Sequence, residues 1–130
     1  MKVLGFDHIG LATKNPKALA DWYIENLGFT LTMTGPTGNY FIETPDHVML
    51  EVMLPGSGEE NVPETLTGWK HIALVPENFD EAVAELKEKG IGADAPVNKR
   101  EDGYCTFFFK DLDGNILHFA KWADDRGMYK

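Results

Sequence analysis

An internal repeat constrains the fold of this chain more than any other feature. Residues 6–29, FDHIGLATKNPKALADWYIENLGF, run parallel to residues 68–91, GWKHIALVPENFDEAVAELKEKGI. The matched positions include one pair of histidines, two pairs of aliphatic residues and one pair of asparagines. They are His8 with His71, Ile9 with Ile72, Leu11 with Leu74, and Asn15 with Asn78. Each copy is typical of a short strand, a turn and an amphipathic helix that ends at glycine.

Strand alternation places each histidine of the repeat on the face away from the aliphatic residues that follow it. The aliphatic face can pack under the next helix. His8 then lies beside Gly10, and His71 beside Ala73, on the opposite face. We therefore expect a concave surface that receives one imidazole from each half of the chain.

The rest of each half follows a common order of elements. In the first half, Asn15 and Pro16 predict a helix start and Gly28 its end. The elements predicted for this half are a strand at 3–13, a helix at 16–27 and strands at 29–33, 40–43 and 48–54. The elements predicted for the second half are a strand after residue 68, a helix at 79–89 and strands at 91–96, 104–110 and 116–121.

This order predicts an α+β protein of two βαβββ modules. At 130 residues we expect one domain, with module 1 at 1–54, a linker at 55–67, module 2 at 68–121 and a tail at 122–130. Neither module has enough apolar surface to be stable alone. The two are expected to pair into a concave, partly closed mixed sheet with the helices outside, within one chain or by exchange in a homodimer.

The net charge limits the class of binding partner, and the cysteine content indicates the cellular compartment. The net charge of −9 and the pI near 4.8 argue against nucleic acid or an anionic membrane and favour a small-molecule partner, a cationic one included. Cys105, the single cysteine, fits a reducing compartment. The sequence shows neither a signal peptide nor a long apolar run, so a cytoplasmic location is expected.

Four side chains are candidates for a metal site: His8, Glu51, His71 and His118. Each half offers one on its first strand and one on its fourth, all on the face away from the helices. A lone strand histidine is more often a hydrogen-bonded core residue, and Glu51 alone would more often pair with a lysine. Four such residues at equivalent points of a repeat favour a site.

Three imidazoles and one carboxylate suit a borderline divalent ion: zinc, nickel, cobalt, manganese or iron(II). The absence of cysteine from the set argues against a closed structural zinc site. Six further residues are candidates for substrate binding: Tyr40, Met49, Met53, Tyr104, Phe107 and Arg100. For any one of these, core packing or a solvated turn is the more frequent role.

The motifs DHIGLAT with WYIENLGF, LEV around Glu51, KHIAL with ELKEKGI, and DLDGN resemble the vicinal oxygen chelate superfamily. That superfamily includes glyoxalase I, methylmalonyl-CoA epimerase, extradiol dioxygenases and bleomycin-resistance proteins. The resemblance implies a metal held by residues at His8, Glu51 and His71. At the family's fourth position, usually glutamate, this chain has His118.

The resemblance leaves three functions open. The first is a metal-dependent lyase or isomerase like glyoxalase I, in which Glu51, or a metal-bound hydroxide beside it, moves a proton α to a carbonyl of a substrate with vicinal oxygens. The second is a non-haem-metal dioxygenase, for which the histidine at 118 is a departure. The third is an antibiotic-sequestering protein of the bleomycin-resistance type, which the acidic charge suits.

Overall fold

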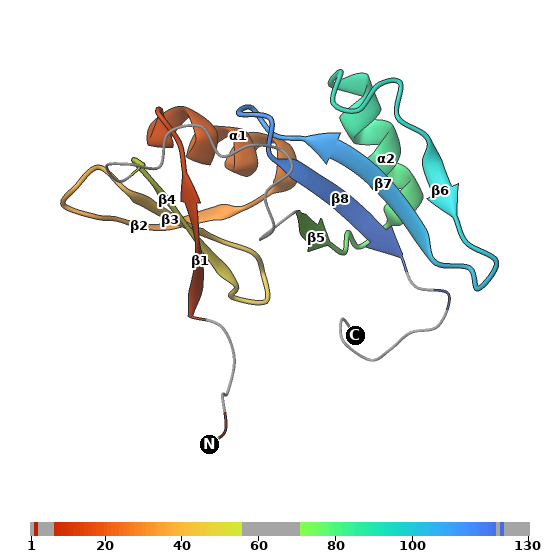
Figure 1. Cartoon of the computed structure of the whole chain (residues 1–130), viewed down its shortest axis with the longest axis horizontal. Helices are drawn as coiled ribbons and strands as arrows, with labels where there is room; N and C mark the ends of the chain where they lie inside the picture. The colour runs from red at the N-terminus through yellow and green to blue at the C-terminus, as the bar shows by residue number, and fades with distance from the viewer. Residues whose placement is uncertain (1, 3–6, 56–70, 122, 124–130) are drawn as a thin grey trace. The chain divides into compact units, whose positions relative to one another are not determined.

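The computed structural model describes residues 2, 7–55, 71–121 and 123. The chain divides into two compact units, Met1–Thr67 and Gly68–Lys130 (Figure 1). The elements of the first unit are β1 (His8–Ala12), α1 (Pro16–Leu27), β2 (Thr30–Thr34), β3 (Tyr40–Glu43) and β4 (Met49–Met53). Those of the second are β5 (Ile72–Leu74), α2 (Phe79–Glu88), β6 (Val97–Lys99), β7 (Cys105–Lys110) and β8 (Ile116–Lys121).

Each unit builds its own four-stranded mixed sheet. The strand order is β1-β4-β3-β2 in the first unit and β5-β8-β7-β6 in the second. The first strand of each unit pairs in parallel with the fourth, and the other pairs are antiparallel. The predicted α+β class with two βαβββ units is thereby confirmed, while the pairing of the two sheets stays a prediction.

Both helices begin where the sequence chemistry requires, and α1 also ends where that chemistry requires. The Asn15 side chain accepts a hydrogen bond from the Ala18 amide at 3.1 Å, and Asn78 accepts one from the Glu81 amide at 3.1 Å. Each asparagine thus satisfies an amide that has no partner inside its helix. Gly28 caps α1 with a φ of 71°, a left-handed conformation that costs glycine little.

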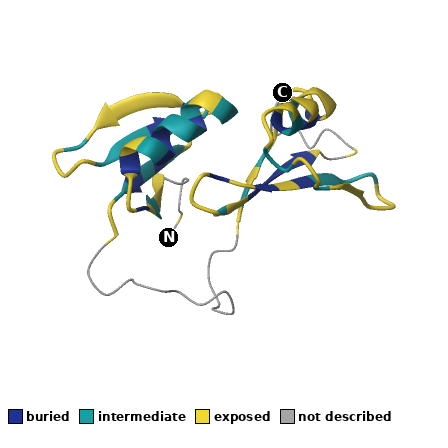
Figure 2. Cartoon of the chain, turned by 90° about the horizontal axis from the view of Figure 1, so that it is seen from above, coloured by how far each residue is buried: buried dark blue, intermediate teal, exposed yellow. Residues whose placement is uncertain are grey.

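The core of each unit lies between its helix and one face of its sheet (Figure 2). In the first unit the fully buried side chains include Leu19 and Tyr23 of α1, Ile42 of β3 and Val52 of β4. In the second unit the buried side chains include Phe79, Val83 and Leu86 of α2, Phe107 of β7, and Leu117 and Phe119 of β8. Burial of these apolar groups is the main term that holds each helix on its sheet.

One predicted strand is wrong. Residues 91–96, expected to be extended, begin with a turn at 91–94, and β6 starts only at Val97. Gly90 and Gly92 both have positive φ values, 77° and 61°, which an extended strand does not allow. A Cβ on Gly92 would lie 2.8 Å from the Phe107 ring, so the turn rests directly on the core of the second unit.

Some predictions fall outside the described residues. These are the start of the first strand at 3–6, the linker at 55–67 apart from Pro55, and most of the tail at 122–130. In the part of the chain that the structure describes, no helix has the length and apolar character needed to cross a membrane.

Candidate functional site

The first unit brings His8 and Glu51 into direct contact. Gly10 of β1 lies opposite Glu51 of β4 in the parallel register, so His8, two residues before Gly10, shares its face with Glu51. His8 Nε2 is 3.0 Å from Glu51 Oε2. Gly10 has no side chain on this face. A Cβ there would lie 3.3 Å from the Met53 side chain, which occupies the space above the glycine.

The other nitrogen of the His8 ring contacts a second carboxylate. His8 Nδ1 is 2.7 Å from Asp7 Oδ2, and a carboxylate can only accept, so Nδ1 donates. The hydrogen bond to Asp7 raises the pKa of His8, and the charge of Glu51 raises it further against the opposing effect of burial. The contact of Nδ1 with Asp7 and that of Nε2 with Glu51 together fix the orientation of the ring.

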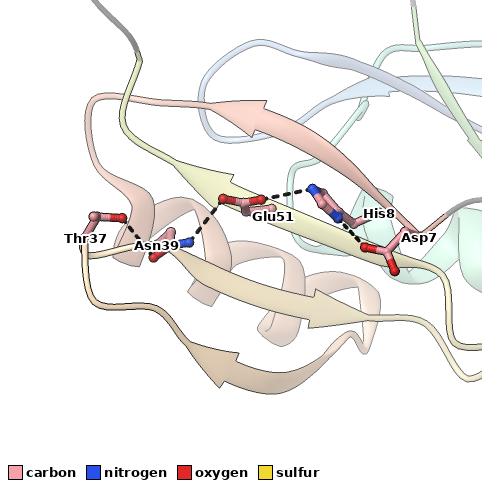
Figure 3. A network of polar contacts seen from close by, with 5 residues as sticks. All are labelled: Asp7, His8, Thr37, Asn39 and Glu51. Atoms are coloured by element: carbon pink, nitrogen blue, oxygen red, sulfur yellow. Dashed lines mark hydrogen bonds and ion pairs between the residues drawn. The ribbon is translucent and has the colours of Figure 1, made fainter.

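The Glu51 carboxylate is held at both of its oxygens. Oε1 accepts a hydrogen bond from Asn39 Nδ2 at 3.1 Å, while Oε2 faces His8. Asn39 in turn accepts a hydrogen bond from the Thr37 hydroxyl at 3.2 Å. Figure 3 shows these contacts as one continuous chain from Thr37 to Asp7.

The second unit brings His71 and His118 together. Their ring centroids are 4.7 Å apart, and the Phe108 ring contacts both, at 6.0 Å from His71 and 4.6 Å from His118. His118 is only 4% exposed, although it lies on the face away from the core aromatics of β8. His71, directly before β5, is exposed.

The orientation of the His118 ring is also fixed by a hydrogen bond. Its Nδ1 lies 3.2 Å from the Phe119 carbonyl oxygen, which can only accept, so Nδ1 donates and Nε2 keeps its lone pair. Burial lowers the pKa of His118, the hydrogen bond to Phe119 opposes that effect, and the nearby His71 adds to it. The ring is therefore biased toward the neutral form that a metal ligand needs.

The sequence repeat is also a repeat of strand register. Gly10 lies opposite Glu51 in the first sheet, as Ala73 lies opposite His118 in the second. The third strands match as well, because Glu51 pairs with a phenylalanine of β3 and His118 with one of β7. These rings, Phe41 and Phe108, each meet the first-strand histidine edge-on. Sequence reasoning overlooked both, although the paired phenylalanines are visible in the repeat.

Two of the six predicted substrate-binding residues lie on the face that carries Glu51. Met49 is opposite His8 in the register, and Met53 overhangs Gly10. Both methionines are half-buried, so their side chains flank Glu51 along β4. Whether they contact a substrate stays a prediction.

Tyr40 and Phe107 lie on the other face of their sheets, so the structure does not place them beside Glu51 or His118. Tyr40 is opposite Val52, on the helix side of the first sheet, because Phe41 takes the position opposite Glu51. Phe107 is fully buried, and its neighbour Phe108 is the residue beside His118.

Tyr104 and Arg100 form a contact of their own at the hairpin between β6 and β7. The guanidinium lies over the Tyr104 ring, 5.3 Å from its centroid. It also forms an ion pair with Asp102 at 2.6 Å. A substrate anion would have to compete with that carboxylate for Arg100, and the predicted anion-binding role remains untested.

Each unit thus supplies a pair of potential metal ligands. Among the described residues, no group of three or more His, Cys, Asp or Glu side chains could hold a metal ion. The pairs are His8 with Glu51 and His71 with His118. Their joint use by one ion stays a prediction.

The chain matches known proteins over most of its length. The family model described as the glyoxalase/bleomycin resistance protein/dioxygenase superfamily matches residues 5–119. Biphenyl-2,3-diol 1,2-dioxygenase 3 of Rhodococcus globerulus is 27% identical over 116 residues, which are 85% of this chain and 59% of that protein. The chain therefore matches about three fifths of that relative's length.

Solved structures share the fold at low sequence identity. A glyoxalase family protein from Enterococcus faecalis has a TM-score of 0.72 at 24% identity, covering 91% of this chain and 98% of that one. Lactoylglutathione lyase from Agrobacterium tumefaciens has a TM-score of 0.68 at 15% identity, covering 92% and 95%. These similarities concern the fold alone.

Proposed function

Because the chain belongs to the glyoxalase/bleomycin resistance protein/dioxygenase superfamily, we propose that it is a metal-dependent lyase or isomerase. Its substrate is a small molecule with vicinal oxygens, and the reaction moves a proton α to a carbonyl group. The observation that carries the proposal is the contact between His8 Nε2 and Glu51 Oε2 at 3.0 Å, with Asp7 and Asn39 holding the far side of each group.

The chemistry of the two pairs fits a divalent ion. In both His8 and His118 the Nδ1 atom donates to a protein oxygen, so Nε2 is the atom that would bind the ion. At His8 this requires removal of the Nε2 proton that is donated to Glu51 Oε2 at 3.0 Å. This is the usual arrangement of metal-binding histidines, whose second nitrogen is hydrogen-bonded to a carboxylate or carbonyl. His8, Glu51, His71 and His118 would hold the ion, and three imidazoles with one carboxylate suit zinc, nickel, cobalt, manganese or iron(II). When bound, the ion supplies Lewis-acid stabilisation of negative charge on substrate oxygens.

Within this set Glu51 accepts the proton. It is the single carboxylate among the four candidate ligands, and therefore the one of the four best suited to take up and return a carbon-bound proton; Asn39 holds its Oε1, and its Oε2 lies against His8. A positioned base of this kind contributes about 100- to 10,000-fold to a rate. Met49 and Met53 flank the carboxylate with apolar surface, which limits competing water.

Hydrogen exchange at carbon tests the proposal without knowledge of the natural substrate. Thiol adducts of 2-oxoaldehydes, α-hydroxy ketones and acyl thioesters are incubated in heavy water with the protein and each divalent metal. We expect the protein to introduce deuterium α to the carbonyl of one class, and Glu51→Gln to lose that activity. Glu43→Gln is the matched control, because Glu43 lies on the adjacent strand on the same face and contacts His47 instead.

Exchange by E51Q at the wild-type rate would refute the role of Glu51. A folded, metal-loaded protein that exchanges none of the three classes would count against the proton-transfer reaction itself.

A second candidate function is a dioxygenase, and the Rhodococcus relative favours it. His8, His71 and Glu51 would provide two imidazoles and one carboxylate, the set that non-haem iron oxygenases use. His118 would then be a further imidazole where the related dioxygenases have a carboxylate. Oxygen uptake with catechols under iron(II) loading separates this function from the first.

Sequestration of a cationic antibiotic is the third candidate, favoured by the net charge of −9. It requires tight binding of the drug without metal and without turnover. Calorimetry with a cationic glycopeptide on metal-free protein distinguishes it from both enzymatic functions.

A further inference from the structure

Asn39 holds Glu51 through a contact that is itself supported on its far side. The residue lies directly before β3, where the turn at 35–38 meets the sheet. Its Nδ2 donates to Glu51 Oε1 at 3.1 Å, and its Oδ1 accepts from the Thr37 hydroxyl at 3.2 Å. Because Oδ1 is occupied by a donor, the amide is fixed with its NH2 group toward Glu51.

The Asn39 amide occupies the space that a Cβ at residue 35 would fill. A Cβ on Gly35 would lie 1.9 Å from Asn39 Oδ1, which no rearrangement of a few tenths of an ångström could relieve. The backbones of the two residues also bond, since the Gly35 amide donates to the Asn39 carbonyl at 2.9 Å. The Asn39 side chain is thus folded back into the turn that positions it.

The second unit provides an internal comparison. Asn39 precedes Phe41 by two residues, and Thr106 precedes Phe108 by two, so Asn39 and Thr106 occupy equivalent positions of the repeat. At the fourth strand the first unit has Glu51 and the second has His118. The amide is therefore present in the unit whose fourth strand carries the carboxylate. A residue needed only for the βαβββ fold would be expected in both units.

We propose that Asn39 is the positioning residue of Glu51. It holds Oε1 so that Oε2 faces His8, and it thereby raises the affinity of the His8–Glu51 pair for a divalent cation and positions the carboxylate that takes the proton. This inference rests on the proposed function for its consequence, but the contact itself can be tested separately. Asn39 touches neither metal nor substrate in this account and acts through Glu51 alone.

The first arm of the test measures cobalt(II) binding by calorimetry. We expect Asn39→Ala to weaken binding about 10- to 100-fold, the usual effect of losing a residue that orients a ligand. Thr37→Val should weaken it less, because the amide survives but its orientation is no longer fixed. Thr106→Ala, at the equivalent position of the second unit, is the matched control and should bind cobalt like the wild type.

The second arm needs no metal. Long-range nitrogen-15 spectra of the metal-free protein report the surroundings of His8 Nε2. In N39A the released Glu51 should move away and shift that resonance, whereas T106A should leave it unchanged. Thermal unfolding of each variant shows that the fold is retained, and Gly35→Ala, which displaces Asn39 by its added Cβ, should reproduce the shift.

The outcomes separate the two proposals. An N39A protein that binds cobalt as tightly as the wild type, or whose His8 Nε2 resonance does not move, overturns the role of Asn39. A wild-type protein that binds no divalent metal refutes the proposed function, and the spectra of metal-free N39A then still decide whether Asn39 positions Glu51.

Discussion

Replacing two neighbouring phenylalanines of β7 should have very different effects on stability. Phe107 is fully buried, whereas Phe108 is 39% exposed on the face that carries His118. Truncating a buried phenylalanine to alanine costs about 3–5 kcal/mol, because the lost transfer energy adds to the cost of the cavity. We expect Phe107→Ala to lose that amount and Phe108→Ala roughly 1–2 kcal/mol, since much of its ring remains in water.

The contacts around Phe107 explain why the cavity cannot close easily. The ring lies opposite Phe119 in the sheet and its centroid is 6.0 Å from that of Phe109. The Lys87 ammonium lies 5.6 Å from the ring centroid, and the turn at Gly92 rests on the ring's edge. Sheet, helix and turn all meet at this side chain, so its removal takes contacts from all three.

Urea unfolding followed by circular dichroism measures both losses. Phe107→Leu is the control, because it keeps an apolar side chain and should lose less than F107A. F108A has a second expected effect that F107A lacks, a weakened cobalt(II) affinity, since Phe108 packs on both His71 and His118. Equal losses of stability for F107A and F108A, or a larger loss for F108A, would refute the assignment of the two faces.

Two further predictions concern the second unit. Gly92→Ala should cost about 1–3 kcal/mol of unfolding free energy, because Gly92 has a φ of 61° and its Cβ would meet Phe107 at 2.8 Å. Gly90→Ala should cost only about 1 kcal/mol, since its φ of 77° is strained but its Cβ meets nothing, and equal costs in urea unfolding would contradict the contact with Phe107. Because burial lowers the pKa of His118, the folded state binds fewer protons than the unfolded state, so His118 should destabilise metal-free protein as pH falls below its ordinary value of 6.5. His118→Gln should therefore lose less stability than the wild type between about pH 7.5 and about pH 5.5, and a larger loss would contradict the lowered pKa.

Local chemistry made much of the fold predictable. Asn15 and Asn78 carry the side chains that cap a helix, and the repeated spacing of His8 and His71 relates the two first strands. The strands Tyr40–Glu43 and Ile116–Lys121 have the predicted bounds. The segment at 91–96 failed because Gly92 was read as part of a strand, whereas its close approach to Phe107 is a tertiary contact that the local sequence does not show.

The sequence predicts only those residues of the candidate site that occur at matched positions of the internal repeat. His8, Glu51, His71 and His118 occur at matched positions, and the structure brings them together as two pairs. Asn39 was not singled out, because a turn asparagine has many ordinary roles and its contact with Glu51 depends on how the turn folds back. Alternation within β7 does not by itself tell whether Phe107 or Phe108 meets the helix, so the face of each ring is known only from the structure.

The central claim is that the two pairs of side chains bind a divalent metal, and calorimetric titration of the metal-free protein with zinc(II) or cobalt(II) tests it most directly. We expect saturable binding of one ion per chain, with loss of binding both in the double variant of His8 and Glu51 to alanine and in that of His71 and His118. The double variant of His47 and Glu43, an exposed pair at 3.4 Å, should bind as the wild type does. Binding that survives the loss of either candidate pair, or no binding by the folded wild-type protein, would contradict the claim.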